Sequence, residues 1–120
     1  MTANPFVILY VEDNDLVRES FAELLAAADR RVVCVADGAG ARGALREQDV
    51  NLLITDINLP DGSGLDLARE ALRQNPSLPV IVCSGHDLRD VARLLGPTAH
   101  PLPKPFDLDE LEALVERLAQ

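Results

Sequence analysis

Apolar residues in this chain gather in five short runs, separated by segments with helical periodicity. The runs lie at residues 6–11, 31–36, 51–55, 79–83 and, more weakly, 100–103. They are nearly continuous rather than alternating, which is typical of parallel strands whose sheet is covered on both faces. The pattern therefore predicts five parallel strands in one sheet.

The segments between these runs have the spacing of amphipathic helices. The expected helices cover residues 15–28, 38–48, 64–74, 87–95 and 107–118. The apolar stripe of the first is expected to consist of Leu16, Phe21, Leu24, Leu25 and Ala28. The last begins with Asp107 and Glu110 as a capping-box-like pair. Strands that alternate with helices indicate an open α/β fold with helices on both faces of the sheet.

Polar residues follow four of the five predicted strands, at the ends where ligands bind in open α/β sheets. In chain order they are Glu12, Asp13, Asn14 and Asp15, then Asp56, then Ser84 and Gly85, and finally Lys104. Because the carboxyl ends of parallel strands share one edge, we expect these groups to converge there. A carboxylate such as Asp56 at the end of a core strand is costly unless it is paired or coordinated.

Three acids at this edge, Glu12, Asp13 and Asp56, are expected to lie within a few ångströms of one another. Two carboxylates about 5 Å apart repel by roughly 3 kcal/mol at an effective dielectric constant near 20. Three of them would raise one another's pKa or require a cation. Mg²⁺ suits a site of one or two carboxylates completed by other oxygen ligands, so the sequence predicts a magnesium site.

Two further residues at the same edge suit an anion. Lys104 follows the fifth run between Pro103 and Pro105, and it is a candidate ion-pair partner of an aspartate or anchor for a phosphate. Ser84 ends the fourth run, and its hydroxyl could donate to a phosphoryl oxygen. A surface lysine and an ordinary turn serine are the alternatives for these two residues.

The composition fits one compact domain, residues 1–120. Of the 120 residues, 48% are hydrophobic and only 3% aromatic, so an aliphatic core is expected. The formal net charge of −9 argues against direct binding of nucleic acid, which needs a basic surface. Without a membrane-length apolar stretch or a signal segment, a cytoplasmic location is expected. Cys34 and Cys83 lie in apolar runs and are expected to be reduced core cysteines.

Four segments stand in an order that is characteristic of a known family: VILYVEDND, LLITDINLPDGSG, VIVCSGH and LPKPF. With them, the chain resembles the receiver domains of two-component response regulators and hybrid sensor kinases over almost its whole length. The resemblance implies a flavodoxin-like, doubly wound sheet with strand order 2-1-3-4-5. It also implies a signalling domain rather than an enzyme, which takes a phosphoryl group from a histidine kinase or a histidine phosphotransfer domain.

The resemblance implies roles for the residues at the strand ends. Asp56 would be the phosphoacceptor. The side chains of Asp13 and Asp56 and the backbone carbonyl of Asn58 would hold Mg²⁺, with Glu12 acting through a metal-bound water. Such an arrangement would explain the aspartate at position 56, because the metal and a lysine would keep it ionised.

Ser84 and Lys104 would bind the phosphoryl group, and the bond between Lys104 and Pro105 would be cis, a form accessible mainly before proline. His86 falls where receivers line the phosphoryl site and is a candidate modulator of hydrolysis, with an exposed loop histidine as the alternative. The position of the family's switch aromatic falls at His100 or Pro101, where this chain has no Tyr or Phe. The usual signalling step is therefore expected to be altered, which favours a relay receiver.

Two other functions stay open on the sequence alone. GAGARG at residues 38–43 matches a dinucleotide-binding glycine motif after a strand, although it follows the second strand and stands behind Asp37. A phosphatase with an aspartyl-phosphate intermediate is the enzyme alternative, but it would require an acid where Asn58 stands. The donor kinase, the pathway, and the choice between a free-standing regulator and part of a hybrid kinase also stay open.

The fifth run carries a proline pattern that predicts its place in the sheet. Pro101, Pro103 and Pro105 are spaced by two, so their missing N–H groups face one side of a strand. An inner strand pairs on both sides, and this one cannot. We expect an edge strand with Leu102 and Lys104 turned toward the fourth strand.

Overall fold

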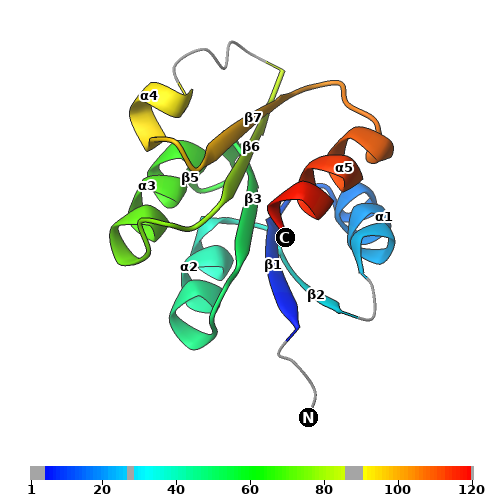
Figure 1. Ribbon diagram of the computed structural model, residues 1–120, viewed down its shortest axis with the longest axis horizontal. Helices are drawn as coiled ribbons and strands as arrows, with labels where there is room; N and C mark the ends of the chain where they lie inside the picture. Colours follow the sequence, from blue (N-terminus) through cyan, green and yellow to red (C-terminus); the bar gives the residue numbers. More distant parts are fainter. Residues whose placement is uncertain (1–4, 27–28, 86–90, 120) are drawn as a thin grey trace.

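Five parallel strands form the sheet that the apolar runs predict (Figure 1). They are β1 (Phe6–Val11), β2 (Arg30–Val35), β3 (Leu52–Asp56), β6 (Val80–Ser84) and β7 (Ala99–Pro103). Their spatial order is β2-β1-β3-β6-β7. Counted along the chain, this is the order 2-1-3-4-5, so the predicted flavodoxin-like topology is confirmed. The computed structural model describes residues 5–26, 29–85 and 91–119.

Five helices cover the two faces of the sheet. They are α1 (Asp15–Leu25), α2 (Gly38–Glu47), α3 (Gly64–Gln74), α4 (Val91–Leu95) and α5 (Leu108–Leu118). Helices α1 and α5 pack on one face, and α2, α3 and α4 pack on the other (Figure 1). Each face has its own aliphatic core, and the inner strands contribute alternate residues to both. The fully buried runs of β1, β3 and β6 follow from this two-sided cover.

Most of the observed helices follow the predicted ranges, with caps that explain where they begin. The predicted end of the first helix is wrong, because α1 ends at Leu25 and Ala26 is extended. Asp107 is the N-cap of α5 and accepts a hydrogen bond from the Glu110 N–H at 2.8 Å. The predicted helix at 87–95 is described only from Val91 onward, because residues 86–90 lie outside the described part of the chain. No helix within the described residues is long and apolar enough to cross a membrane.

The apolar stripe predicted for α1 is partly wrong. Leu25 is fully buried and Phe21 is half-buried, but the side chains of Leu16 and Leu24 are 77% and 55% exposed. One helical residue corresponds to a rotation of about 100°, so Leu24 points well away from Leu25, and Leu16 lies about 140° from Phe21. The buried stripe is therefore narrower than the sequence suggested. Ala28 lies outside the described residues.

The two cysteines have different environments. Cys83 is buried in β6, between β3 and β7, as expected. Cys34 is exposed, and the expectation of a core cysteine is wrong there, because it lies on the edge strand β2. An apolar run in the sequence does not distinguish an inner strand from an edge strand.

The fifth strand of the sheet, β7, is an edge strand, as its prolines predict. It borders only β6. The Lys104 N–H donates to the Ser84 carbonyl at 2.8 Å, and the Val80 N–H donates to the Thr98 carbonyl at 3.0 Å. The alternate positions held by Pro101 and Pro103 are exposed and need no donor.

A short hairpin after β3 was not predicted from the sequence. Strands β4 (Asn58–Leu59) and β5 (Gly62–Ser63) pair in antiparallel fashion and lead directly into α3. Two-residue strands leave no periodicity in a sequence. Gly62 has φ +152°, which explains why a glycine stands in this hairpin.

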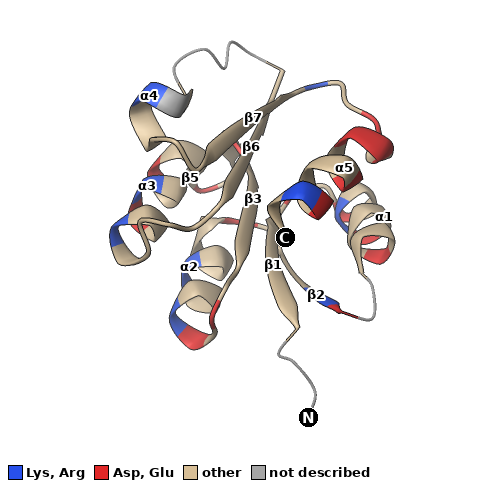
Figure 2. Ribbon diagram, viewed as in Figure 1, with Lys and Arg blue, Asp and Glu red and all other residues tan. Residues whose placement is uncertain are grey.

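Figure 2 shows acidic and basic residues interspersed along the helices. No helix or strand of the described part of the chain is uniformly basic there, which agrees with the net charge of −9.

The start of α3 passes so close to the end of β3 that only glycine fits at position 64. A Cβ atom on Gly64 would lie 1.7 Å from the Asp56 carbonyl oxygen, whereas a Cβ on Gly43 would meet nothing within 4 Å. Gly64→Ala should lower the free energy of unfolding by about 3 kcal/mol through overpacking. Gly43→Ala, the matched control in the middle of α2, should raise it by about 0.5–1 kcal/mol through helix propensity. Urea unfolding monitored by circular dichroism measures both, and equal stability of the two variants would contradict the close approach.

Candidate functional site

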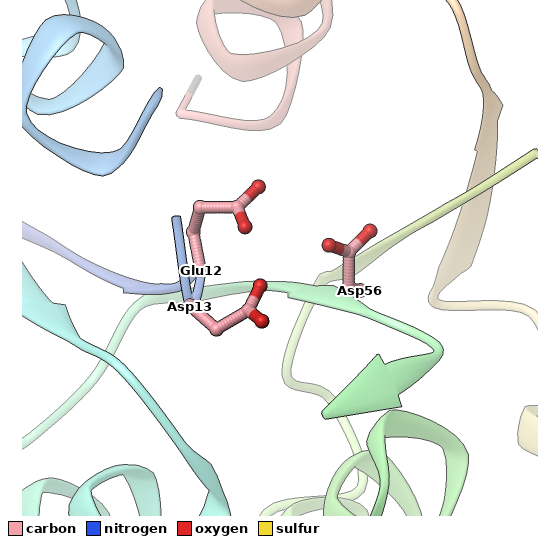
Figure 3. Close-up of side chains that lie close together, drawn as sticks. All are labelled: Glu12, Asp13 and Asp56. Atoms are coloured by element: carbon pink, nitrogen blue, oxygen red, sulfur yellow. The ribbon is translucent and has the colours of Figure 1, made fainter. Parts of the chain in front are cut away.

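Three carboxylates meet at the carboxyl end of the sheet. Glu12 and Asp13 directly follow β1, and Asp56 ends β3, which is paired with β1 so that Val11 lies opposite Thr55. One carboxylate oxygen from each acid lies within 4.8 Å of the others. Figure 3 shows the three side chains directed toward a shared space. The register of two neighbouring inner strands thus brings together residues that are more than 40 positions apart in the sequence.

The three acids of this cluster repel one another when they are ionised. Glu12 is 7% exposed, and its burial raises the pKa of its carboxyl group above the usual value. The Asn14 N–H donates to Glu12 Oε2 at 3.1 Å and opposes that rise, whereas the negative charge of Asp56 adds to it. A cation among the three acids would relieve this repulsion. Hard carboxylate oxygens are the donors that Mg²⁺ prefers, so these residues fit that ion.

Lys104 supplies one positive charge to the cluster. Its Nζ lies 2.7 Å from Asp56 Oδ1. Partial burial lowers the pKa of Lys104, but the hydrogen bond to Asp56 and the charges of Asp56 and Glu12 outweigh this, so its pKa is raised. Lys104 therefore stays protonated. The Lys104–Pro105 peptide bond is cis.

A small cavity beside Asp56 is lined by the other residues that were predicted at this edge of the sheet. Its volume is about 130 Å³, and its lining includes Asp56, Asn58, Ser84 and Lys104. Ser84 is the last residue of β6 and is buried, whereas Asn58 begins β4 and is exposed. The cavity is bounded by a carboxylate, a hydroxyl and an ammonium group, which is a suitable lining for an anion attached to Asp56.

Some residues of the acidic segment serve the helix rather than the site. The Asn14 side chain is the N-cap of α1 and accepts from the Val17 N–H at 3.0 Å. Asp15 forms an ion pair with Arg18 at 2.6 Å, and Arg18 also donates to the Glu12 carbonyl at 2.9 Å. The VEDND segment is thus divided between the carboxylate cluster and the start of α1.

Two histidines were candidates for a role at this site. His86 lies outside the described residues. His100 lies in β7, opposite Ile81, and burial together with the charge of Arg117 lowers its pKa. It is not among the residues that line the cavity beside Asp56.

A second, larger cavity adjoins the carboxylates and was missed by the sequence analysis. It measures about 400 Å³, and its walls include Tyr10, Phe21 and Phe106 as well as Asp56 and Lys104. The Tyr10 and Phe21 rings are stacked with centroids 6.3 Å apart, and the Phe21 and Phe106 centroids are 5.9 Å apart. The sequence contains few aromatic residues, and nothing in their spacing indicates that three of them lie around one cavity.

The glycine motif at residues 38–43 does not offer a phosphate site. It forms the first turns of α2, where a pyrophosphate would need the exposed N–H groups. The carboxylate of Asp61 accepts from the N–H groups of Gly38 and Ala39 at 2.8 and 3.0 Å, and Asp37 accepts from that of Gly40 at 2.8 Å. Two carboxylates therefore occupy the donors that a dinucleotide would use.

Comparisons with known proteins agree with this geometry. The family model described as the response regulator receiver domain matches residues 8–116. The response regulator protein PmrA of Pseudomonas aeruginosa is 38% identical over 115 residues, which cover 94% of this chain and 52% of that protein. The DNA-binding transcriptional regulator NtrC of Escherichia coli is 34% identical over 113 residues, which cover 92% of this chain and 24% of that protein. The chain thus spans between a quarter and a half of these relatives.

Solved structures agree as well. A response regulator receiver protein from Sinorhizobium medicae superposes with a TM-score of 0.85 at 28% identity, covering 95% of this chain and 94% of that one. The response regulator protein TrrA of Thermotoga maritima, solved in complex with Mg(2+)-BeF, gives a TM-score of 0.80 at 25% identity, with 94% and 98% covered.

The repulsion within the carboxylate cluster can be measured through stability. In metal-free buffer, Asp13→Asn should raise the free energy of unfolding by about 0.5–1 kcal/mol, because it removes one of three like charges from a site with one lysine. Asp49→Asn, which changes an exposed acid shortly before β3, is the matched control and should leave stability nearly unchanged. Urea unfolding in the presence of a chelator provides the comparison. A less stable Asp13→Asn variant would show that the three acids do not repel one another in the folded chain.

Proposed function

This chain belongs to the response regulator receiver domain family, and we propose that it accepts a phosphoryl group on Asp56 in a histidine-to-aspartate phosphorelay. The donor would be a phosphohistidine of a histidine kinase or of a histidine phosphotransfer domain. The observation that carries the proposal is the position of Asp56, which has Lys104 at 2.7 Å and two further acids within 4.8 Å. Residues 1–120 would act as one cytoplasmic domain without direct contact to nucleic acid.

In the transfer, one bond to phosphorus forms and one breaks, and the protein contributes only the attacking carboxylate. A carboxylate oxygen of Asp56 attacks phosphorus, the phosphorus–nitrogen bond of the donor breaks, and its electron pair remains on the imidazole. Positioning and charge neutralisation supply most of the catalysis in such transfers. Lys104 holds Asp56 in place before the transfer, and afterwards its ammonium group and the Ser84 hydroxyl are placed to contact the oxygens of the new phosphoryl group.

The side chains of Asp13 and Asp56 and the backbone carbonyl of Asn58 would hold Mg²⁺, with Glu12 acting through a metal-bound water. When bound, Mg²⁺ supplies positive charge to the oxygens of the transferring group. Three carboxylates, one divalent cation and one lysine sum to no net charge. The complex of the relative TrrA with Mg(2+)-BeF supports this choice of ion.

The first test of this function is chemical labelling. Incubation with Mg²⁺ and acetyl phosphate should add one acid-stable, base-labile phosphoryl group, because an acyl phosphate at Asp56 is cleaved by base. Asp56→Asn should remove the label, and Asp66→Asn, an exposed acid in the first turn of α3, should retain it. Intact-protein mass spectrometry with site mapping reads the result. A label that survives Asp56→Asn, or that maps to Ser84, would refute the assignment.

We further infer that the phosphorylated state leaves the face formed by α4, β7 and α5 little changed. All four aromatic residues of the chain belong to or pack against the core on the α1 and α5 side of the sheet. The strand β7 carries His100 and Pro101 at the positions where an aromatic switch would be expected. A bound group shifts an equilibrium only through different contacts in two states, and these residues offer few. A relay receiver, which passes its phosphoryl group to a partner histidine, fits this reduced response.

The second test is amide chemical-shift mapping with and without beryllofluoride, at a constant concentration of Mg²⁺. Shifts should concentrate at residues 56–64 and 84–88, with small changes over 89–120 apart from Lys104, which is proposed to contact the phosphoryl oxygens. The sedimentation coefficient should stay the same, because no new interface is expected to form. Large shifts across 89–120, or dimerisation on addition of beryllofluoride, would contradict the relay inference and leave the phosphoacceptor assignment standing.

A further inference from the structure

The hairpin that follows the phosphoacceptor has little stability of its own. Strands β4 and β5 contain two residues each and pair only with each other, Asn58 with Ser63 and Leu59 with Gly62. A two-stranded hairpin of this length is not stable alone in water. Yet it begins with Asn58, which lines the cavity beside Asp56 and whose carbonyl is the proposed third metal ligand. Contacts outside the hairpin must therefore fix its position.

One such contact is made by Asp61, at the turn of the hairpin. Its Oδ1 accepts from the Gly38 N–H at 2.8 Å, and its Oδ2 accepts from the Ala39 N–H at 3.0 Å. These hydrogen bonds lower the pKa of Asp61, so the carboxylate stays charged near the positive end of the α2 dipole. Because both oxygens are engaged, the contact fixes orientation as well as distance.

The partner surface on α2 is shaped to admit this carboxylate. A Cβ atom on Gly38 would lie 3.2 Å from Asp61 Oδ1 and 3.0 Å from an Arg42 nitrogen, which is tighter than ordinary contact. Arg42 is in turn held by Glu70 of α3, with Nη2 to Oε2 at 2.7 Å. The turn of the hairpin thus lies against the N-terminus of α2, a helix that is itself joined to α3 by the Arg42–Glu70 ion pair.

We propose that Asp61 is a positioning residue for the metal: its bidentate contact with the N-terminus of α2 holds the β4–β5 hairpin so that Asn58, whose carbonyl is the proposed third ligand, stays beside Asp56. This inference rests on the proposed function, because it concerns the same magnesium site. Asp61 touches neither the metal nor the reacting atoms, and it acts through the backbone of the hairpin. Without it, two of the ligands, from β1 and β3, would remain in place while the third would be loosely held.

The test measures Mg²⁺ binding to the unphosphorylated chain by calorimetry. Asp61→Ala should weaken the affinity by about 10-fold, in the range found when groups that orient metal ligands are removed. Asp66→Ala removes a nearby exposed acid of equal charge and should change the affinity little. At saturating Mg²⁺, Asp61→Ala should be labelled by acetyl phosphate at a rate close to that of the unaltered chain, because the substitution weakens metal binding and leaves the phosphoacceptor in place.

A second pair of variants moves the carboxylate without altering any charge. Gly38→Ala should push Asp61 away and weaken Mg²⁺ binding in the same direction, by less than Asp61→Ala. Gly43→Ala, where nothing lies within 4 Å of the new Cβ, gains the same helix propensity and should bind Mg²⁺ like the unaltered chain. This pair keeps the test decisive even if Asp61→Ala fails to fold.

These measurements distinguish a failure of the proposed role of Asp61 from a failure of the proposed metal site. Unchanged Mg²⁺ affinity in Asp61→Ala and Gly38→Ala, with only reduced stability, would show that the contact is merely structural and overturn the role of Asp61. Absence of Mg²⁺ binding by the unaltered chain would overturn the proposed metal site, and the role of Asp61 with it. Weaker binding in both variants, with normal binding in both controls, is the expected result.

Discussion

The repulsion among three carboxylates in one small volume is the constraint on which the rest of this structure depends. Glu12, Asp13 and Asp56 lie within reach of one ion because β1 and β3 are adjacent and in fixed register. Flexible loops would let these acids move apart, but both strands are buried in the middle of the sheet. Lys104, at the end of β7, partly offsets the charge at 2.7 Å from Asp56. The sheet therefore holds an excess of negative charge at this edge, which a divalent cation can neutralise.

The segment after Asp56 is held by close backbone approach rather than by a large apolar contact. Gly64 brings the start of α3 against the Asp56 carbonyl, and its N–H donates to the Ile57 carbonyl at 2.6 Å. On the other side of the hairpin, Asp61 reaches the N-terminus of α2, where Gly38 leaves room for it. A Cβ atom would clash with the Asp56 carbonyl at Gly64 and would crowd Asp61 at Gly38, so two glycines help to determine the geometry beside the carboxylate cluster.

The sequence predicted those features that are fixed by local chemistry and periodicity. The inner strands were evident because two-sided burial makes them continuously apolar, and the edge position of β7 followed from prolines that lack a donor. It failed where the outcome depends on what lies opposite a residue. Leu16 and Leu24 suit a core but are turned outward on α1, and Cys34 lies in an apolar run on an exposed edge. The contact of Asp61 with α2 spans 23 residues and leaves no pattern in the sequence.

The two faces of the sheet offer different means of response to a charge added at Asp56. On the α1 and α5 side, the rings of Tyr10, Phe21 and Phe106 line a cavity next to Asp56. On β7, His100 and its proline neighbours provide no aromatic side chain with two packing states. On the α2 and α3 side, by contrast, the hairpin is joined to both helices by hydrogen bonds and close contacts that have discrete geometry. Because the start of α3 lies against the Asp56 carbonyl and the hairpin is hydrogen-bonded to α2, we expect a backbone shift at Asp56 to change the contacts of Gly64 and Asp61. The side of the domain that carries α2 and α3 is therefore where a change in the charge of the site is expected to be felt.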